Sequence, residues 1–375
     1  MKEKLIIRNF GPIKDVEIEF RSINIFIGDQ GTGKSTVSKL YTIIYNYAYY
    51  DVFDANFENT HDPNTLKFFK YLELFGVLNY LQNGTTIIYS SEKFNFEFGE
   101  GVVKTEHPEF YRMLPTEMPE RLQDYFTFNY IPAERVFVST LADALYGLNE
   151  LGTKLPTLFN RFGNKFSSAR KEKARRNYVH LLGADFGHNN GIDTIITQDG
   201  KEFPLSDAST GLQGTMPLLV VFDSIVDKKS IKLSDSPSSL LVIEEPELNL
   251  FPDTQKKVLN YLISNSIGDG LFKLRLIINT HSPYILTSIN NLMYAYEVGA
   301  SQQEKVNRII PKKYWVNPAD VSAYRLLPNG TCREIVKKTE DGTLIEAAEI
   351  DEVSRELNKE FDELIKLEIT NTETE

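Results

Sequence analysis

Cysteine is almost absent from this sequence of 375 residues. The single cysteine, Cys332, cannot form an internal disulfide, and no Cys-x-x-Cys pair offers a zinc site. The first ten residues lack the apolar stretch of a signal peptide, and no later apolar run is long enough to cross a bilayer. We therefore expect a cytoplasmic protein that makes no contact with a membrane.

Positive charge is also in short supply. The 41 Lys and Arg residues are outnumbered by 52 Asp and Glu residues, which gives a net charge of −11. This balance argues against a uniformly basic surface for nucleic acid. DNA or RNA would need a local patch, and Arg170–Arg176 is the one conspicuous basic run. A solvated helix face is the more ordinary interpretation of that run, and the nucleic-acid patch is its alternative.

The most informative stretch, INIFIGDQGTGKST, runs from Ile23 to Thr36. Its apolar start predicts a buried strand, and the residues after it predict a helix with apolar positions at helical spacing. Between the two, Gly28 and the sequence Gly-Lys-Ser at 33–35 have the spacing of a phosphate-binding P-loop. Glycines let several backbone N–H groups face one anion, and the helix N-terminus adds partial positive charge. The chain is therefore predicted to bind a nucleoside triphosphate.

Each position of this loop has an expected role. Lys34 should reach the β- and γ-phosphates, which makes it both a binding and a catalytic candidate, and the Ser35 hydroxyl should ligate Mg²⁺. The predicted nucleotide-binding residues of the loop are Gly28, Asp29, Gln30, Gly31, Thr32, Gly33, Lys34, Ser35 and Thr36.

A second candidate element ends in two acids. Leu240–Ile243 is an apolar, β-prone run followed by Glu244-Glu245-Pro246. This pattern is typical of a Walker B strand, in which the first acid holds Mg²⁺ through water and the second deprotonates the attacking water. A surface Glu-Glu-Pro turn would be the ordinary alternative, but a P-loop in the same chain favours the functional interpretation. Glu244 is thus the predicted metal-side acid and Glu245 the predicted catalytic base.

Two shorter elements complete the candidate site. His281 follows a predicted buried strand, Leu276–Ile278, and should lie near the γ-phosphate as a catalytic residue if that strand neighbours the others. Ser209 and Gly211 belong to a small-residue loop that leads into a helix N-terminus, although Ser-x-Gly is common in ordinary turns.

The remaining segments predict an α/β chain with insertions. We expect strands at 4–10 and 16–20, a β-hairpin over 85–98 that turns at 91–92, and mainly helical structure over 136–205. Short alternating segments near 293–297, 321–327 and 331–336 precede an amphipathic helix at about 351–367. The predicted domains are a nucleotide-binding core at 1–50 and 206–290, an inserted antiparallel and helical lobe at 51–130, a helical lobe at 131–205, and β segments with the amphipathic helix at 291–375.

The order GDQGTGKS, STGLQ, LLVIEEPE and NTHS resembles the head of an ABC-type ATPase, and more narrowly the RecF/SMC/OLD-like group of soluble ATPases. The start, RNFGPIKDVEIEF, is similar to that group's usual start. IPAER, EEPELNLFP and THSPYIL resemble its OLD-like and anti-phage members. The resemblance covers about residues 1–290. It implies a P-loop NTPase fold with a mixed central sheet, an antiparallel β lobe and a helical lobe.

The resemblance also implies ATP and Mg²⁺ as ligands and a homodimer that closes around ATP. Ser209 and Gly211 would then contact the nucleotide bound by the partner subunit, and His281 would be the switch histidine. The family's Q-loop position falls at IPAER, which makes Glu134 a candidate to sense Mg²⁺. Arg8 and Asn9 are further candidates to approach the nucleotide.

Several residues depart from the family pattern. Gln30 stands where Asn is usual, Glu244 replaces the common Asp, and Asn249 and Phe251 occupy positions where OLD-like relatives often carry histidines. No long heptad tract divides the head, and no clustered acidic metal pattern of a Toprim nuclease follows residue 290.

These features lead to three functional hypotheses. The first is an ATPase whose ATP-gated homodimerisation controls a separate nuclease or toxin in bacterial defence or DNA repair. The second is an ATP-binding scaffold with little turnover. The third is the ATPase subunit of a membrane transporter, which the STGLQ signature and the aromatic insertion disfavour.

Overall fold

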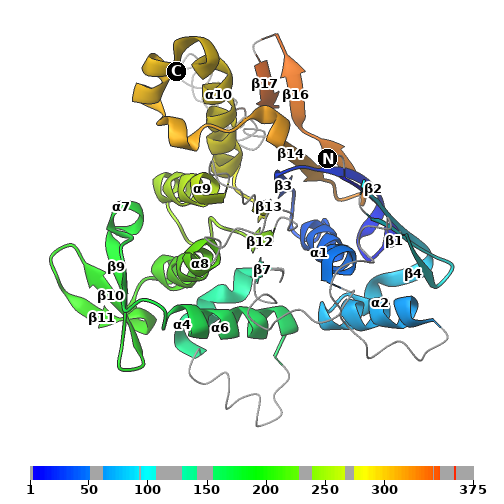
Figure 1. Ribbon diagram of the computed structural model, residues 1–375, viewed down its shortest axis with the longest axis horizontal. Coiled ribbons are helices and arrows are strands. Elements are labelled where there is room, and N and C mark those ends of the chain that lie inside the picture. The colour runs from blue at the N-terminus through cyan, green and yellow to red at the C-terminus, as the bar shows by residue number, and fades with distance from the viewer. Residues whose placement is uncertain are drawn as a thin grey trace, which may run out of the picture.

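The computed structural model describes residues 3–50, 62–92, 94–106, 129–141, 155–227, 239–266, 274–340, 342–346 and 359. These residues form a central mixed sheet with a second, antiparallel sheet and α1 on one side and the helices α8, α9 and α10 on the other (Figure 1). No helix among them is both long and apolar enough to span a bilayer. The α/β fold with a mixed central sheet is as predicted.

Six strands make the central sheet, in the order β15-β14-β3-β13-β12-β7. Neighbouring strands from β14 to β7 run parallel, and β15 pairs antiparallel at the edge. The strands are β3 (Ile23–Ile27), β7 (Asn129–Ile131), β12 (Leu240–Glu244), β13 (Arg275–Thr280), β14 (Val321–Leu326) and β15 (Cys332–Glu334). Because parallel strands all point the same way, the carboxyl ends of β3, β12 and β13 meet at one edge of the sheet.

Helices follow the strands that carry the expected motifs. The predicted P-loop helix is confirmed as α1 (Lys34–Tyr50), and the apolar stretch 215–226 lies in a helix. The larger helices are α1, α2 (Pro63–Leu74), α6 (Thr157–Ala169), α8 (Thr210–Asp227), α9 (Pro252–Ser266) and α10 (Pro283–Ile309). Single turns of helix lie at α4 (Val138–Leu141) and α7 (Val179–Leu182). The 3₁₀ segments are η3 (Leu78–Tyr80), η5 (Ala133–Phe137), η6 (Leu205–Asp207), η8 (Lys312–Tyr314) and η9 (Pro318–Asp320).

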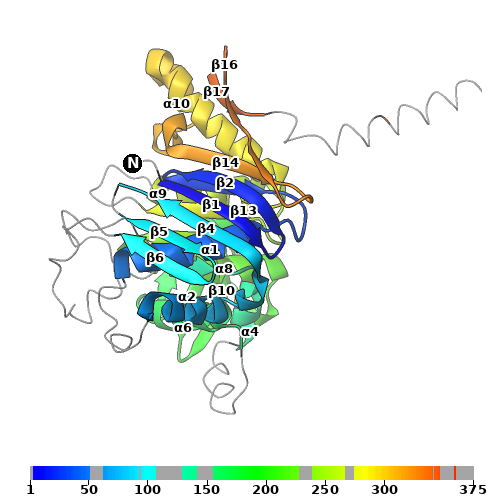
Figure 2. The same ribbon diagram turned by 90° about the vertical axis from the view of Figure 1, so that its right-hand side faces the viewer.

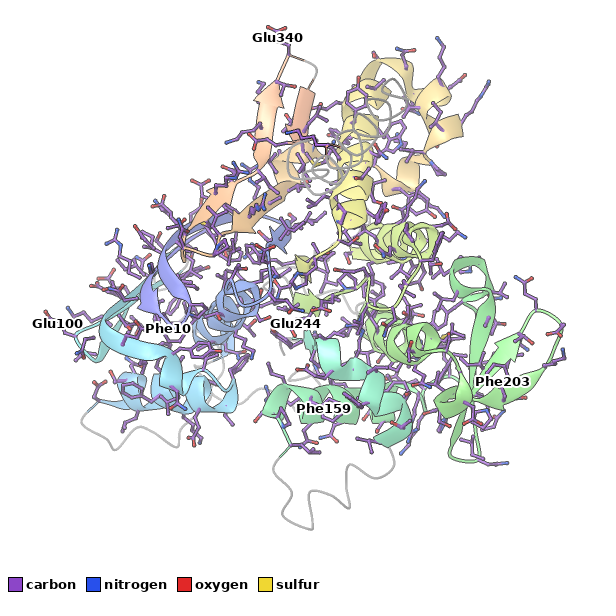
Figure 3. All side chains as sticks on the ribbon, turned by 180° about the vertical axis from the view of Figure 1, so that it is seen from behind. Phe10, Glu100, Phe159, Phe203, Glu244 and Glu340 are labelled. Carbon is purple, nitrogen blue, oxygen red and sulfur yellow. The ribbon has the colours of Figure 1, made fainter. Side chains whose placement is uncertain are left out.

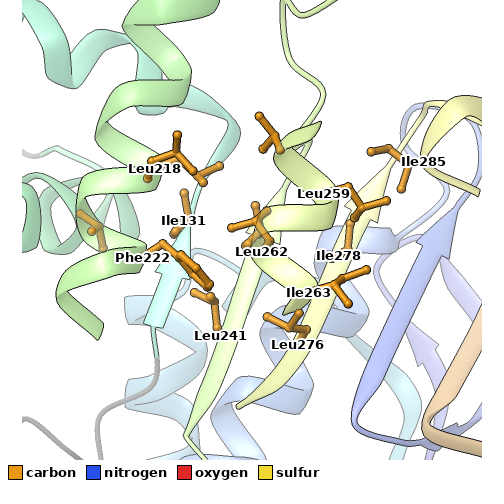
Figure 4. Close-up of a cluster of buried hydrophobic side chains, with 14 of the residues drawn as sticks. Ile131, Leu218, Phe222, Leu241, Leu259, Leu262, Ile263, Leu276, Ile278 and Ile285 are labelled. Carbon is orange, nitrogen blue, oxygen red and sulfur yellow. The ribbon is translucent and has the colours of Figure 1, made fainter. Parts of the chain in front are cut away.

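The two faces of the central sheet bury different side chains. Leu241 and Ile243 of β12 pack with α8 and α9, whereas Leu240 and Val242 belong to the core shared with α1 and the antiparallel sheet. Figure 4 shows the first of these cores, with Phe222 of α8 and Leu262 of α9 directed at the strands. Strands covered on both faces are apolar at nearly every position, which is why β12 and β13 were recognisable as buried strands.

The antiparallel sheet has the order β2-β1-β4-β5-β6, and its strands lie side by side in Figure 2. They are β1 (Glu3–Phe10), β2 (Ile13–Phe20), β4 (Leu81–Ser90), β5 (Asn95–Gly99) and β6 (Val102–Glu106). The predicted hairpin over 85–98 is confirmed by β4 and β5. The first two strands, which lie in the predicted core at 1–50, belong to the same sheet as β4, β5 and β6 of the predicted inserted lobe.

The prediction of a mainly helical segment over 136–205 is wrong. The segment holds α6 but also a four-stranded antiparallel sheet in the order β11-β10-β9-β8. These strands are β8 (Arg175–Arg176), β9 (Ala184–Asn189), β10 (Ile192–Thr197) and β11 (Glu202–Pro204). Asn190 and Gly191 both have positive φ, at 50° and 82°, and connect β9 to β10 in a two-residue turn. Asn-Gly is the preferred sequence for such a hairpin turn.

The segments after residue 290 follow the prediction in part. Strands at 321–327 and 331–336 are confirmed by β14 and β15, and a short hairpin of β16 (Val336–Thr339) and β17 (Gly342–Ile345) follows. The strand expected near 293–297 is wrong, because these residues lie inside α10. The predicted helix at 351–367 lies outside the described residues apart from position 359. The domain boundaries stay a prediction, although β14 joins the central sheet beside β3.

The basic run at 170–176 does not form a solvated helix face, which was its more ordinary interpretation. Its first arginine, Arg170, ends α6 and pairs with Asp193 at 2.6 Å, and both side chains are buried. Arg175 pairs with Asp185 at 2.7 Å. Two of the run's other cations, Lys173 and Arg176, also lie near acids, and both approach Asp227. Most of the positive charge in this run is therefore neutralised within the fold.

A buried charged cluster joins the antiparallel sheet to the central one. Glu3 of β1 accepts hydrogen bonds from Tyr41 (2.7 Å) and Tyr89 (2.8 Å) and pairs with Arg275 of β13. Burial acts to raise the pKa of Glu3, but Arg275 and the two hydroxyls outweigh it, and the pKa lies below its usual value. The cluster therefore depends on a charged carboxylate.

Replacing Arg275 by Met should leave Glu3 buried without a cation. We expect the free energy of unfolding at neutral pH to fall by about 3–5 kcal/mol, measured by urea denaturation. The difference between mutant and wild type should shrink in acid. The pKa of Glu3 in the folded state lies below its pKa in the unfolded state, so the charged carboxylate stabilises the fold at any pH above the unfolded-state pKa. This stabilisation is lost as the pH falls through the folded-state pKa. Lys4→Met is the matched control, since Lys4 pairs with Glu17 at the surface. A loss no larger than that of Lys4→Met would contradict the conclusion that Arg275 stabilises the buried carboxylate of Glu3.

Candidate functional site

The P-loop connects β3 to α1 with a backbone that requires glycine at two positions. Gly28 has φ of 152°, and a Cβ there would lie 2.4 Å from the Leu326 carbonyl oxygen of β14. Gly33 has φ of 100°, and α1 begins at the residue after it. Any other residue type would clash at the first position and be strained at the second. The loop thus keeps the tight curvature that the sequence pattern predicts.

Lys34 lies across this loop. Its Nζ donates hydrogen bonds to the carbonyl oxygens of Gly28 (2.7 Å) and Asp29 (2.9 Å). Burial lowers the pKa of Lys34, while the carboxylates of Glu245, Asp29 and other nearby acids act in the opposite direction. The ammonium is thus mostly removed from water and lies among acceptors, as a group that neutralises an anion would be.

Glu244 ends β12 and is 9% exposed. Its carboxylate accepts a hydrogen bond from the Tyr130 hydroxyl at 2.6 Å and from the Ala133 amide at 3.3 Å. Burial raises the pKa of Tyr130 well above its usual value, and the neighbouring carboxylate adds to this effect. Tyr130 therefore stays protonated and fixes one oxygen of Glu244. Figure 3 labels Glu244 near the centre of the molecule.

Glu245 adopts a backbone conformation that L-residues rarely take. Its φ is 45°, in the left-handed region, and its amide donates to the Asn279 carbonyl at 2.8 Å. The side chain is about one-third exposed, and its Oε1 lies 3.7 Å from Nε2 of His281. Such a conformation costs on the order of 1 kcal/mol or more and persists only where the surroundings enforce it.

His281 follows β13 on a backbone that Glu247 holds in place. The Glu247 carboxylate accepts hydrogen bonds from the Thr280 hydroxyl (2.7 Å) and from the His281 amide (2.8 Å). The imidazole is left partly exposed beside Glu245. Glu247 was not among the predicted site residues, and the Glu-Pro-Glu spacing gives no separate signal for its role.

A pocket of about 330 Å³ collects the predicted elements at the carboxyl edge of the sheet. This volume lies within the range of small-molecule sites. Its lining residues are Pro12, Gln30, Gly31, Gly33, Lys34, Ser35, Thr36, Tyr80, Ala133, Glu134, Glu244, Glu245, Asn279 and His281. Cationic and hydroxyl donors of the P-loop thus share one cavity with three acids and an imidazole, an arrangement suited to phosphoryl transfer to water.

The family follows from the sequence comparison. The chain matches the AAA ATPase domain family over residues 1–135 and 139–286, a span that includes every motif that lines the pocket. The chain belongs to this family. It is therefore an ATPase and binds nucleotide, as predicted, and this agrees with the expected ABC-type head of the RecF/SMC group.

Solved structures with partial similarity to this ATPase include an SMC head domain from Thermotoga maritima, with 13% identity, a TM-score of 0.39, and 92% of this chain and 98% of that chain covered. A second is an SMC head bound to the C-terminal winged-helix domain of ScpA, with 12% identity, a TM-score of 0.41, and 89% and 97% covered. A third is RecF with an ATP analogue, with 10% identity, a TM-score of 0.36, and 89% and 98% covered. Comparison with curated proteins finds no match. Similarity at this level carries no argument about function.

Some predicted residues do not line the ATPase's pocket. Gly28, Asp29 and Thr32 belong to the P-loop but are not among the lining residues. Arg8 pairs with Asp15 at the surface, at 3.3 Å, and the Asn9 side chain donates to the Gly84 carbonyl. The residues that do line the pocket without being predicted are Pro12, Tyr80, Ala133 and Asn279.

The loop at 209–213 also lies apart from the pocket. Ser209 is exposed, and Gly211 in the first turn of α8 packs against the backbone that follows the two glutamates. A Cβ at Gly211 would lie 2.6 Å from the Asn249 carbonyl oxygen. Asn249 itself has φ of 57°. The small residue is therefore required by a close contact between α8 and the segment after β12.

Arg135 is the one arginine of this site that is completely buried, with 0% exposure. Its guanidinium donates to the carbonyl oxygens of Glu244 and Glu245, both at 2.6 Å, and to that of Gly214 in α8, at 3.1 Å. Burial lowers its pKa to about 10, while the nearby glutamates act in the opposite direction, so it is charged at neutral pH. Arg135 thus fixes the backbone that carries both acids, and it ties that backbone to α8.

Replacing Arg135 by Lys should slow ATP hydrolysis. The guanidinium donates to four separated carbonyls, those of Glu244, Glu245, Gly214 and Pro132, and one ammonium with three N–H groups cannot do so, so the Glu245 backbone should shift. We expect kcat to fall about 10- to 100-fold with a smaller change in KM for ATP, measured by phosphate release. Arg308→Lys, at an exposed position in the last turn of α10, is the control and should behave like the wild type. An unchanged kcat in Arg135→Lys would mean that the hydrogen bonds of Arg135 do not position Glu244 and Glu245.

Proposed function

We propose that this ATPase hydrolyses ATP with Mg²⁺ in the pocket at the carboxyl edge of the central sheet, and that ATP binding closes a homodimer. The observation that carries the proposal is that Lys34, Ser35, Glu244, Glu245 and His281 line one cavity. These groups come from three separate stretches of sequence. A pocket with another function would not be expected to bring together a lysine, a hydroxyl, two carboxylates and an imidazole from these three motifs. The parallel pairing of β3, β13 and β12 brings the three stretches together.

The donor set fits a nucleotide with its magnesium ion. Lys34 and the α1 N-terminus supply positive charge for the β- and γ-phosphates. Among the described residues, no three His, Cys, Asp or Glu side chains gather to hold a metal by themselves. Mg²⁺ relies on substrate phosphates and keeps several waters, so it needs few protein ligands. Ser35 and Glu244 would supply the protein ligands, with Glu134 beside them at the rim; the metal's contribution when bound is charge neutralisation.

Glu245 is the proposed general base. Its carboxylate is partly exposed and lies in the pocket, where it can accept a proton from the attacking water. His281 lies 3.7 Å away and would orient the γ-phosphate or that water. The left-handed φ of Glu245 supports this role, because backbone strain of this kind is concentrated at functional sites.

The loop at Ser209 and Gly211 supports the homodimer. These residues lie at the N-terminus of α8, where backbone N–H groups favour an anion, yet they do not line their own chain's pocket. These residues would bind an anion if a second copy of the chain placed its nucleotide against them. Phe251 is 79% exposed near the same segment and would be covered in such a dimer.

A scaffold with little turnover is the second candidate. It is favoured by the two hydrogen bonds to Glu244, which engage both oxygens of the proposed metal-side acid. Control of a separate nuclease or toxin, in defence or repair, is proposed from the motif order alone. Binding of DNA or RNA is not supported by the run at 170–176, because its charges are largely paired.

Replacing Glu245 by Gln should separate the ATPase from the scaffold. The amide keeps the shape of the side chain but cannot accept the proton, so phosphate release should fall at least about 100-fold. Affinity for ATP, measured by calorimetry, should be retained, and the dimer should persist with ATP in light scattering. The control is Glu97→Gln, an exposed change on β5 of the antiparallel sheet. If the wild type released no phosphate with Mg²⁺ although nucleotide bound, the scaffold would be the better description.

Mixing two inactive variants should test the shared site. Lys34→Ala removes the phosphate lysine, and Ser209→Arg blocks the exposed loop, so each variant alone should lack activity. If each pocket uses Ser209 from the other subunit, random dimers of the two should regain about a quarter of the wild-type rate per subunit. Each variant mixed with wild-type protein is the control for exchange of subunits. Full activity of Ser209→Arg alone, or no gain on mixing, would exclude this arrangement.

A further inference from the structure

The end of α10 and the 3₁₀ turn after it present positive charge to solvent. Residues 305–314 hold four cations and no acid, although the whole chain has a net charge of −11. Three of these cations, Lys305, Lys312 and Lys313, are exposed. The ammonium groups of the first two contact glutamine side chains, and that of the third lies over a tyrosine ring. In the part of the chain that the structure describes, none of the three forms an ion pair, in contrast to the run at 170–176.

An apolar side chain lies among these lysines. Ile309 is 81% exposed, more than any other large apolar side chain in the described residues. It belongs to the last turn of α10 and follows Lys305 by four residues, so the two side chains share one face of the helix. Lys305, Ile309, Lys312 and Lys313 together form what we call the cationic surface. It offers a partner both positive charge and an apolar contact.

Residues 347–375 have the complementary charge. They hold ten acids and three cations, so their net charge of −7 is most of the −11 of the chain. The amphipathic helix predicted at 351–367 has apolar residues along one side. Glu356, Glu360 and Glu363 follow one another at spacings of four and three residues, so in that helix they would lie in a row beside the apolar side. The sequence thus predicts acids next to apolar side chains, the match of the cationic surface.

The strand that precedes this acidic segment is held against α10. The amide of Ile345 in β17 donates to the Asn290 side chain of α10 at 2.9 Å, and Figure 1 shows β17 beside that helix. From Asn290 to Lys305, α10 extends over no more than about 22 Å. The five residues 346–350 and a helix of about 25 Å can cover this span. Because so short a tether gives a high effective concentration, the segment of the same chain is favoured over that of a second copy.

We propose that the acidic segment at 351–367 docks on the cationic surface of its own chain. Its apolar side covers Ile309, and its row of glutamates lies against the three lysines. Exposed ion pairs contribute little singly, but three of them beside an apolar contact act together. An acidic partner protein would have to displace this segment before it could use the same lysines. None of these residues lines the nucleotide pocket, so the docking goes beyond the proposed function.

Cross-linking between two engineered cysteines tests the docking in the full chain. In a Cys332→Ser background, Ser301→Cys places a thiol on α10 before the cationic surface, and Asn358→Cys places one in the acidic segment, so no proposed contact is removed. A short bismaleimide should join the two thiols within one chain, as seen by gel mobility and peptide mass spectrometry.

The matched control for the cross-link pairs Asn358→Cys with Ser168→Cys. Ser168 is also an exposed serine, but it lies on α6, at the opposite end of the molecule from α10 in Figures 1 and 2. Its cross-link to position 358 should form at least about tenfold more slowly. Melting curves establish that each variant is folded.

Charge reversal tests whether the lysines hold the segment. Changing Lys305, Lys312 and Lys313 together to Glu should slow the cross-link between positions 301 and 358 about fivefold or more, because three attractions become repulsions. High salt should slow it in the same sense without any reversal. The control changes three exposed lysines elsewhere by the same charge, Lys104→Glu, Lys171→Glu and Lys201→Glu, and should alter the rate by less than about twofold. Cross-links that join two chains, no cross-link, or a rate unaffected by reversal at the cationic surface would overturn the inference.

Discussion

The parallel register of β3, β13 and β12 is the constraint on which the site depends. Thr280 pairs with Ile27, the last residue before the P-loop, and Glu244 pairs with Asn279. A shift of one residue in either pairing would turn Glu244 or Asn279 to the opposite face of the sheet. The two cores on either side prevent such a shift, because each face of these strands is covered by its own set of apolar side chains.

The charged groups of the site depend on one another. Burial lowers the pKa of Lys34, and the neighbouring acids act in the opposite direction. The two acids in turn depend on Arg135, whose guanidinium donates hydrogen bonds to the backbone carbonyls of Glu244 and Glu245. Because these bonds use the backbone, the two carboxylates stay available for the nucleotide and its metal. Tyr130 holds Glu244 while Glu245 stays partly exposed, so two adjacent carboxylates have different environments and can have different roles.

Local signals made the core of this fold predictable from sequence. The P-loop spacing, the two apolar strands with polar ends and the 85–98 hairpin each depend on residues close together in the chain, and all are present. The hairpin at Asn190-Gly191 had a local signal too, but the helical interpretation of 136–205 overlooked it. Residues 293–297 alternate in polarity and yet lie in α10, because short alternation does not distinguish a strand from a helix surface.

Other features had no signal in the sequence. The joining of β14 to β3 is a contact between distant segments, and no local pattern encodes it. Arg135 is a single residue whose importance comes from what surrounds it, because four backbone carbonyls converge on one guanidinium. The same holds for the paired charges of the run at 170–176, since their acidic partners lie elsewhere in the chain.

The position of β3 between β13 and β14 has a consequence for biosynthesis. The strand that leads into the P-loop ends at Ile27, whereas its neighbours on both sides begin only at Arg275 and Val321 and are made well after it. At about 5–20 residues per second, the ribosome needs on the order of tens of seconds to supply them. During that interval β3 lacks the two strands that flank it in the finished sheet, so the sheet around the P-loop strand cannot be completed until both have been synthesised.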